Sequence, residues 1–412
     1  MGEGSDLNRW EAFPDAGFYA QMESGVTLQD YVPRHECVRL IGISPLSFIQ
    51  NMYAQETGCQ TYIIDVSWKD LTKLAIQTGD FLLLHVLDSF RASADYDFLD
   101  NWIELVHDIS PTVTDSYAYS AFTNELPTYL IIKSFKILNS PVIIPPLLPE
   151  KLASPAPQFG HGTLTAFHVG QGMCSLFSYG ADHFLLDAGA GTPVNRAAYK
   201  SGYHVDLSRF YNDLENMTFD KTLTAIISHS DSDHWRLLEW DPILLGHVSS
   251  IYLPSGTPSL ALRSPQVIGK VKGLSTCAIE FDRNNQLQVF RTDPLHSDKN
   301  GEALVVRVLC NGLNALVPGD YVYDRIATDN DRDLATLAYC SYGAIIVPHH
   351  GDEASANAVP SSLWWRARAF FSAGTHARYR HPRKASLDAH ASAGFTVISD
   401  RSCRDIKAFQ LL

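Results

Sequence analysis

The chain has 412 residues, a formal net charge of −13, and hydrophobic and charged fractions of 45% and 19%. These fractions are ordinary for a globular protein, so the composition excludes a disordered or fibrous chain, and the length suffices for two or three domains. The first ten residues are polar and acidic, no apolar run approaches the roughly 20 residues that span a bilayer, and seven scattered cysteines lack a C-x-x-C spacing. We therefore expect a cytoplasmic protein without a signal peptide, a membrane partner or a disulfide framework.

The N-terminal part of the sequence is acidic and mixes strand-like with helix-like patterns. Residues 1–150 hold 8 basic and 20 acidic side chains, whereas 151–412 hold 24 and 25. Apolar runs predict strands over 38–43, 61–66, 80–86 and 129–135, and helical spacing predicts helices over 47–55 and 99–106. We expect a small α+β or β-rich accessory domain over 1–140. Its negative charge disfavours nucleic acid and favours a protein partner, or contact with its neighbouring domain.

A proline-rich stretch follows, with six prolines between residues 141 and 157. Proline lacks the N–H that ladder pairing needs and restricts the residue before it, so this stretch predicts an extended linker over 141–157. The second domain would then cover 158–412. The alternative is a proline-rich edge inside one domain.

The second part of the sequence indicates a strand-rich α/β domain. Apolar runs predict strands over 163–169, 174–178, 183–187, 223–228, 250–253, 303–309, 315–317, 344–347, 369–372, 395–398 and 406–409. Helical patterns interleave with them over 206–216, 260–271 and 331–338. This pattern is long enough for two sheets with helices outside.

Four potential metal ligands follow the predicted strand 223–228 within six residues: His229, Asp231, Asp233 and His234. Alternation places the first three side chains on one side of an extended turn. Imidazole together with carboxylate suits zinc, manganese or iron. The alternative is a solvated loop that is rich in serine, aspartate and histidine.

Short motifs across residues 160–412 resemble the metallo-β-lactamase superfamily, and more narrowly its branch with the hydrolase domain of the bacterial DNA-uptake (competence) channel protein. In chain order they are V-G-Q-G at 169–172, L-x-D-x-G at 185–189, H-x-D-x-D-H at 229–234, G-D at 319–320, H-H-G at 349–351, and S-x-G with H-P at 372–374 and 381–382. The resemblance implies an α/β fold of the αββα sandwich type, with metals at the strand ends.

The sequence also departs from the family pattern. Met173 stands where V-G-Q-G is usually followed by aspartate, and Asp352 stands where H-H-G is usually followed by serine. The G-H-T-P-G-H segment that supplies a third histidine in lactamases and glyoxalases is absent. His296 lies 24 residues before Asp320, in the region of that histidine, and is either a ligand or a loop residue.

The expected cofactor is a pair of divalent ions, zinc or manganese. We assign His229 and Asp231 to one ion and Asp233 and His234 to the other, with Asp320 between them, because only a cation offsets so many carboxylates. A water held between the ions would lose its proton near neutral pH and attack as hydroxide.

Further residues complete the predicted site. His350 would complete the second metal position, with His349 as the fallback, and Asp187 would orient the ligand loop rather than bind metal. Asp233 is also counted as catalytic, as is His381, which carries the H-P position and is the candidate to contact the substrate or to protonate the leaving group.

The substrate class follows from charge. No acidic residue lies between 354 and 387, where arginines accumulate, and Arg378, Arg380 and Arg383 are predicted to bind substrate because arginine forks suit phosphate oxygens. Trp364 and Trp365 could stack bases, although this spacing is more typical of core or interface residues. The alternative for the basic stretch is a solvated face, or one that contacts the acidic domain.

The sequence therefore predicts a metal-dependent hydrolase, a phosphodiesterase or nuclease acting on nucleic acid or a nucleotide. One rival is a lactam, lactone or thioester hydrolase on the same fold. The other is a non-catalytic metal-binding scaffold or sensor, because fold alone does not decide function.

Overall fold

The computed structural model describes residues 12–31, 35–80, 83, 85, 101–152, 160–197, 199, 211–257, 259–295, 301–374 and 379–412. The chain divides into two compact units. The first comprises Met1–Pro145 with Ser259–Gly269, and the second comprises Pro146–Pro258 with Lys270–Leu412. The chain therefore passes between the units three times, whereas the predicted division at 141–157 implied a single passage.

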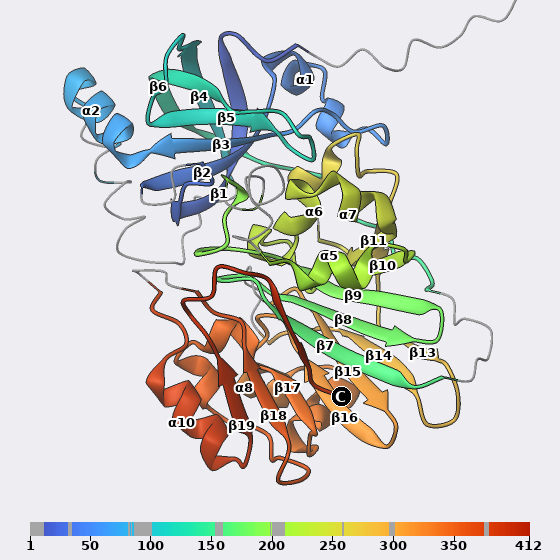
Figure 1. The fold of residues 1–412 in the computed structure, drawn as a ribbon. Helices are drawn as coiled ribbons and strands as arrows, with labels where there is room; N and C mark the ends of the chain where they lie inside the picture. The colour runs from blue at the N-terminus through green and yellow to red at the C-terminus, as the bar shows by residue number, and fades with distance from the viewer. Residues whose placement is uncertain are drawn as a thin grey trace, which may run out of the picture. The chain divides into compact units, whose positions relative to one another are not determined.

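The first unit is built on a closed barrel of six strands (Figure 1). The strands are β1 (Gly17–Leu28), β2 (Glu36–Ile43), β3 (Tyr62–Ser67), β4 (Asn101–Ile109), β5 (Ser116–Ser120) and β6 (Thr128–Pro141), in the order β1-β2-β3-β5-β6-β4. All neighbours are antiparallel. Alternate residues such as Phe18, Ala20 and Met22 of β1 point into the barrel core.

Short helices complete the first unit: α1 (Pro45–Ile49), a 3-10 turn (Met52–Ala54) and α2 (Trp68–Thr78). Both α-helices begin at a serine whose hydroxyl accepts a backbone N–H, Ser44 for α1 and Ser67 for α2. The predicted helix over 47–55 corresponds to α1 and the 3-10 turn. The predicted strands 38–43, 61–66 and 129–135 lie within or across β2, β3 and β6.

Two predictions in the first unit are wrong. The segment 99–106 was expected to be a helix, but its described residues, 101–106, form most of β4, because pairing with both β1 and β6 closes the barrel and overrides the helical spacing. The segment 80–86 was expected to be a strand, but its residues Leu83 and His85 have helical backbone. The rest of 81–86 lies outside the described residues.

The segment Ser259–Gly269 belongs to the first unit although it lies between two strands of the second. Thr61 Oγ1 donates to the Ala261 carbonyl at 3.2 Å, and the Cys59 N–H donates to the Arg263 carbonyl at 3.0 Å. The helix predicted over 260–271 is therefore wrong. The segment forms a 3-10 turn (Ala261–Arg263) followed by further short turns, and two of its carbonyls accept hydrogen bonds from Cys59 and Thr61.

The second unit contains two seven-stranded mixed sheets. The first sheet runs β12-β11-β10-β9-β8-β7-β20, with β7 (Gly162–His168), β8 (Cys174–Tyr179), β9 (Asp182–Ala188), β10 (Leu223–Ile226), β11 (Val248–Pro254), β12 (Val271–Leu274) and β20 (Lys407–Gln410). The second sheet runs from β13 to β19 in chain order, with β13 (Cys277–Glu280), β14 (Gln286–Arg291), β15 (Leu304–Cys310), β16 (Leu313–Val317), β17 (Ala344–Ile346), β18 (Arg368–Phe371) and β19 (Thr396–Ser399).

Each sheet combines an antiparallel half with a parallel half. Strands β9 to β12 are parallel in the first sheet, and β16 to β19 are parallel in the second. The predicted strands of this part are all present, whereas β12, β13 and β14 were not predicted. Short helices accompany the sheets: α5 (Asp213–Thr218), α6 (Arg236–Trp240), α7 (Pro242–His247), α8 (Tyr323–Thr328), α9 (Arg332–Thr336) and α10 (Lys384–Ser392).

The helices predicted over 206–216 and 331–338 have different outcomes. Helix α5 begins only at Asp213, and residues 206–210 lie outside the described residues. Helix α9 and the 3-10 turn after it match 331–338. In the described part of the chain, no helix combines the length and the apolar character that crossing a membrane requires.

A continuous apolar core lies between the two sheets. Leu164, Leu186 and Ile226 of the first sheet share one cluster with Val306 and Ile346 of the second. A separate cluster joins the other face of the second sheet to α8 and α9. Two mixed sheets that share one core, with short helices outside, fit the metallo-β-lactamase-like fold that the motifs implied (Figure 1).

Candidate metal centre

The candidate ligands lie where parallel strands of both sheets end. The segment His229–His234 follows β10 of the first sheet, while Asp320 follows β16 and His350 follows β17 of the second. The Leu304 N–H donates to the Ser228 carbonyl at 2.7 Å and joins the two sheets at this point. The carboxyl ends of parallel strands are where α/β folds usually place ligands.

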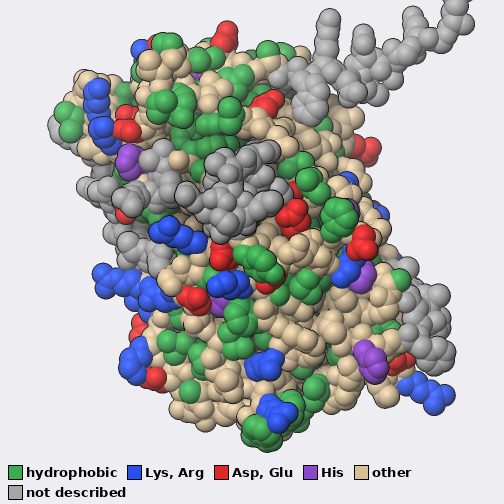
Figure 2. Space-filling model, in the orientation of Figure 1, with side chains coloured by type: hydrophobic (Ala, Val, Ile, Leu, Met, Phe, Trp, Pro, Cys, Tyr) green, Lys and Arg blue, Asp and Glu red, His purple; other side chains and the backbone are tan. Residues whose placement is uncertain are grey.

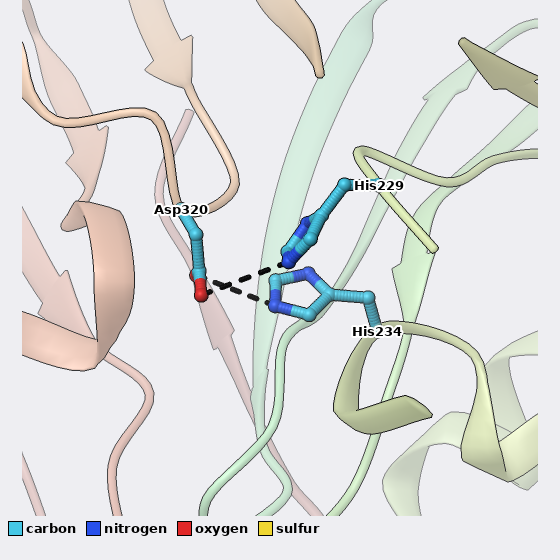
Figure 3. Close-up of side chains that lie close together, drawn as sticks. All are labelled: His229, His234 and Asp320. Carbon is cyan, nitrogen blue, oxygen red and sulfur yellow. Dashed lines mark ion pairs between the residues drawn. The ribbon is translucent and has the colours of Figure 1, made fainter. Parts of the chain in front are cut away.

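The first group of potential ligands is His229, His234 and Asp320, all buried. One ligand atom of each lies within 4.8 Å of the others. His234 Nε2 is 3.3 Å from Asp320 Oδ1, and His229 Nε2 is 3.8 Å from Asp320 Oδ2. Figure 3 shows both imidazoles directed at this carboxylate from the opposite strand-end loop. Two imidazoles and a carboxylate are a donor set that divalent transition metals accept.

The second group shares His234 with the first and adds Asp233 and His350. His350 Nε2 lies 3.1 Å from Asp233 Oδ2 and 3.8 Å from Asp320 Oδ1. The two groups therefore overlap at His234 and meet at Asp320. This arrangement can hold two neighbouring cations rather than one.

Asp231 and His349 flank these groups. Asp231 Oδ2 is 3.5 Å from His229 Nε2, and His349 Nε2 is 3.8 Å from Asp320 Oδ2. The other nitrogen of His349 lies 3.2 Å from Asp352 Oδ2, so the aspartate that directly follows the H-H-G turn holds this imidazole. His350 is the deeper of the pair, with 2% of its side chain exposed against 33% for His349.

The backbone of the H-H-G turn turns both histidines toward the centre. His349 and His350 have φ of 47° and 54°, in the left-handed region that residues with a Cβ rarely adopt. Such strain persists only where the surrounding structure compensates it, and it concentrates at functional sites.

Four buried atoms of the cluster lack a hydrogen-bond partner among the described residues: His229 Nε2, His234 Nε2, His350 Nε2 and Asp320 Oδ1. A buried polar atom without a partner costs roughly 1–3 kcal/mol, and most folded proteins avoid it. All four atoms face the same space between the strand ends. A cation bound there would satisfy them together, so the residues present fit a metal ion.

The opposite sides of the imidazoles are held by the protein. Asp187 Oδ2 lies 3.0 Å from His234 Nδ1, and both oxygens of Asp187 also accept hydrogen bonds from Ser228, at 2.6 Å from its N–H and 3.0 Å from its hydroxyl. His350 Nδ1 donates to the Ser372 carbonyl at 2.8 Å. These contacts fix the rings and leave each Nε2 directed at the centre. The contacts of Asp187 agree with an orienting role.

The carboxylates and imidazoles of the cluster shift one another's ionisation. Burial opposes charge on Asp320, but His234 and His349 hold the pKa of its carboxyl well below the usual range. Burial also opposes charge on His234, and Asp187 and Asp320 nevertheless raise the pKa of its imidazole well above the ordinary value. A divalent cation would compete with that proton for the same nitrogen, so metal binding here should weaken as the pH falls.

His381 lies beside the cluster. Its ring is stacked on that of His350, with centroids 6.2 Å apart and planes within 13°, and its centroid lies 5.9 Å from that of His349. Burial, followed by the charges of these two histidines, lowers the pKa of His381 to about 3. The imidazole is therefore neutral near pH 7, which favours substrate contact over proton donation to a leaving group.

Not every predicted site residue can be placed. Arg378 and His296 lie outside the described residues. Arg380 is exposed, and Arg383 is partly exposed and donates its backbone N–H to the Gly351 carbonyl at 2.7 Å. The basic segment is thus attached to the H-H-G turn.

The tryptophan pair lies elsewhere. Trp364 and Trp365 are 40% and 76% exposed, so neither is a core residue. They precede β18, whereas the centre lies beyond its C-terminal end at Ser372. The guanidinium of Arg366 lies over the Trp365 ring at 4.3 Å. The pair therefore does not stack bases at the metal centre.

Apart from Asp187, the sequence analysis assigned no residue to supporting the ligands, and it gave no such role to the V-G-Q-G turn. The Met173 N–H donates to the Asp233 carbonyl at 3.1 Å, and the Ser372 hydroxyl donates to the Gly172 carbonyl at 2.5 Å. A Cβ at Gly172 would lie 2.5 Å from the Ala190 nitrogen, and one at Gly189 would lie 1.5 Å from the Asp233 carbonyl. Glycine is required at these motif positions because another backbone segment approaches closely. The glycines were therefore the sequence signal that could have identified these supporting contacts.

Comparison with known proteins gave only distant likenesses. No family model matches the sequence, and no curated protein matches it. Solved structures with some likeness include a mutant of the CmlA β-hydroxylase, at 12% identity and a TM-score of 0.35 over 63% of this chain and 55% of that one. This chain thus spans little more than half of the CmlA chain.

Two further structures carry the fold name in their descriptions. The metallo-β-lactamase fold protein YhfI from Bacillus subtilis matches at 11% identity and a TM-score of 0.31, over 60% of this chain and 99% of that one. MEM-A1, a subclass B3 metallo-β-lactamase isolated from a soil metagenome library, matches at 15% identity and a TM-score of 0.27, over 48% of this chain and 82% of that one. Likenesses at these scores identify no activity, so the site's own geometry has to support any function.

Proposed function

We propose that the second unit is a metal-dependent hydrolase with a metallo-β-lactamase-like αββα sandwich and two divalent ions, zinc or manganese. The observation that carries the proposal is the convergence, on one space at the ends of parallel strands, of four buried atoms that have no hydrogen-bond partner among the described residues. Structural histidines and aspartates normally find hydrogen-bond partners. A cluster that leaves its inward-facing atoms unpartnered is better explained as a ligand set.

The proposed ligands follow the two overlapping groups. His229 and Asp231 would hold one ion, Asp233 and His350 the other, and His234 and Asp320 lie within reach of both groups. When bound, two divalent cations supply Lewis acidity to the attacked group and acidify water in the site.

The protein's own residues supply orientation and shelter. Asp187 and Ser228 hold His234 in one ring orientation, and the Ser372 carbonyl does the same for His350. Burial of these groups limits water, which strengthens every electrostatic interaction with a bound anion. Removing such outer partners typically costs 10- to 100-fold in metal affinity or activity.

A phosphodiester is the proposed substrate class. It is supported by the absence of acidic residues over 354–387 and by attachment of the Arg380–Arg383 segment to the H-H-G turn. On the face drawn in Figure 2, basic and acidic side chains of the described residues are interspersed. The charge argument therefore depends on this segment beside the centre. The acidic first unit would serve as an accessory, protein-binding domain.

The test is a substrate panel with the full-length protein, stripped of metal and reloaded with Zn²⁺ or Mn²⁺. We expect turnover of bis(p-nitrophenyl) phosphate and of single-stranded oligonucleotides, and no turnover of a β-lactam, a lactone or a thioester. Hydrolysis of a carboxyl derivative alone would favour the rival hydrolase. Stoichiometric metal without any turnover would favour the metal-binding scaffold.

The basic segment can be tested separately. Replacing Arg380 and Arg383 by alanine should raise KM for an oligonucleotide, with metal content unchanged. The slope of the logarithm of affinity against the logarithm of salt concentration should become shallower by roughly 0.7 per lost phosphate contact. The matched control is Arg366→Ala, which removes an arginine that stacks on Trp365 before β18. An unchanged salt slope in the double variant would remove the main support for a phosphodiester.

A further inference from the structure

Gln171, in the V-G-Q-G turn after β7, is buried, and among the described residues its side-chain amide makes two contacts. Its Oε1 accepts a long hydrogen bond from the Gly374 backbone N–H at 3.5 Å. Its Nε2 lies 3.3 Å from Nδ1 of His381. The side chain therefore lies between the turn after β7 and the segment that carries His381.

These contacts determine which way the amide faces. The backbone N–H of Gly374 can only donate, so the amide oxygen must face it and the NH₂ group must face His381. An amide NH₂ group can only donate in turn. Nδ1 of His381 is therefore the acceptor and carries no proton, and the single proton of the neutral ring is on Nε2.

His381 is also held in place relative to the candidate ligands. Its ring is stacked on that of His350, and its centroid lies 5.9 Å from that of His349. The following segment is attached to the H-H-G turn, because the Arg383 N–H donates to the Gly351 carbonyl at 2.7 Å. His381 is 6% exposed, so it has little freedom to reorient.

We propose that Gln171 is a positioning residue that fixes the tautomer of His381, so that its Nε2–H donates a hydrogen bond to an anionic oxygen of the substrate at the metal centre. This inference rests on the proposed function and adds one role to it. A neutral imidazole in this tautomer polarises an oxygen and does not act as a base through Nδ1. Triosephosphate isomerase is the known example of a neutral imidazole used in this way. Phosphoryl oxygens, which are acceptors only, suit such a donor.

A purely structural role for Gln171 predicts different behaviour. The Gly374 backbone packs tightly, since a Cβ there would lie 1.6 Å from the Thr192 carbonyl oxygen and 2.7 Å from the backbone nitrogen of Gln171. If Gln171 served only to hold this loop, any side chain that accepts from Gly374 would suffice. Gln171→Glu separates the two roles, because a carboxylate still accepts from Gly374 but cannot donate to His381.

The first measurement is the tautomer of His381, read from histidine ¹⁵N chemical shifts of the full chain without metal and assigned with His381→Gln. We expect the Nε2–H form in the parent and the Nδ1–H form in Gln171→Glu. Gln171→Met, which removes both hydrogen bonds, should give a mixture. Gln77→Glu, on the exposed face of α2, is the matched control and should leave the parent tautomer. An Nδ1–H form in the parent would overturn the proposal.

The second measurement is turnover with loaded metal. We expect kcat to fall about 100- to 1000-fold in Gln171→Glu, with KM and metal content nearly unchanged, as for loss of one donor to a transition-state oxygen. His381→Ala should lose a similar factor, and the double variant should lose no more than His381→Ala. Additive losses would overturn the coupling between the two residues.

The two proposals fail in different ways. If the parent protein hydrolyses no phosphodiester with either metal, the proposed function fails, and the ¹⁵N measurement still decides the tautomer. If Gln171→Glu does not fold, the parent and Gln171→Met spectra decide whether Gln171 fixes the tautomer.

Discussion

Two clusters of buried carboxylates, one in each unit, differ in how their charge is balanced. In the barrel, Arg39 makes two hydrogen bonds to Asp65, at 2.7 and 2.8 Å, and lies 3.2 Å from Asp30. Tyr117 donates to Asp65 at 2.7 Å and Tyr119 donates to Asp30 at 2.5 Å. Burial opposes charge on Arg39, but Asp65 raises the pKa of its guanidinium further above its ordinary value. This cluster contains its own cation.

The cluster of the second unit contains no such cation. Among the described residues, every ion pair of Asp233 and Asp320 is with a histidine. An imidazole carries charge only when protonated, and then its nitrogen is no longer a ligand. The comparison indicates that buried acids with a guanidinium among them are structural, whereas buried acids surrounded by imidazoles with unpartnered nitrogens accommodate a metal ion.

The largest expected effect comes from a substitution in the second unit's cluster, which lacks a guanidinium among its described residues. Asp320→Asn removes the carboxylate that both ligand groups approach, so phosphodiester turnover should fall at least about 100-fold, since even outer-shell partners cost 10- to 100-fold. Bound metal per chain, measured by elemental analysis, should fall as well. Asp108→Asn, which removes an exposed carboxylate paired with Lys133 at 2.8 Å, is the control. Full metal content in Asp320→Asn would show that the cluster is not the metal site.

The next largest effect comes from removing the cation of the barrel cluster. Arg39→Met leaves Asp30 and Asp65 buried without a counter-charge, so the free energy of unfolding in urea should fall by about 3–5 kcal/mol. Combining it with Asp30→Asn and Asp65→Asn should recover part of that loss, because the uncompensated charge is gone. Metal content should stay at the parent level. A loss below about 1 kcal/mol would mean that the barrel does not depend on this ion pair.

A third kind of buried ionisable group stays neutral. Burial lowers the pKa of His390 from 6.5 to about 4, and its ring nitrogens contact the Tyr323 hydroxyl at 2.9 Å and the Ser386 carbonyl at 2.7 Å. At a pH between these two pKa values, His390 binds a proton in the unfolded chain but not in the folded chain. The resulting stability is present above pH 6.5 and is lost as the pH falls to 4, by up to about 3 kcal/mol.

The measurement is urea unfolding across that pH range. His390→Gln should flatten the pH dependence, whereas His161→Gln, at an exposed position, should not. An equal slope in parent and His390→Gln would contradict the assignment. Samples loaded with metal should show an additional pH dependence, because protons compete with the metal for the imidazole nitrogens of the cluster.

The smallest effect concerns the choice of metal. Asp231 brings oxygen rather than nitrogen to His229, which hardens that position and favours manganese over zinc. Turnover should therefore be faster with Mn²⁺ than with Zn²⁺, by roughly tenfold or less, and Asp231→His should narrow or reverse the order. Asp333→His, at an exposed position of α9, is the control.

The same experiment can test whether His296 is a ligand of the first ion. His296 lies outside the described residues, and a loss of bound metal in His296→Ala would reveal a third histidine at the first ion. Faster turnover with Zn²⁺ in the parent, together with that loss, would show an ordinary three-ligand zinc position and would contradict the manganese prediction.

Local sequence was a good guide to the strands that border the centre, and it failed at particular elements elsewhere. The apolar runs that became β7 to β10 and β15 to β18 are buried along most of their length, so most of their side chains are hydrophobic whatever the pairing. Strand β4 has helical spacing, and only its two partners in the barrel make it a strand. Strand β14 alternates Leu287 and Val289 toward the core, a signal that was present and overlooked.

By itself, the sequence determined the kinds of ligand and their local order, because His229 to His234 lie within one loop and Asp320 and His350 follow their own strands. It left open whether His349 or His350 is the deeper residue. Only the tertiary structure decided that His350 lies 3.1 Å from Asp233 while His349 pairs with Asp352. It also decided that 259–269 joins the barrel unit and that Gln171 reaches His381. Apart from the local pair His349–Asp352, these contacts join residues far apart in the chain, and long-range packing selects them rather than local propensity or spacing.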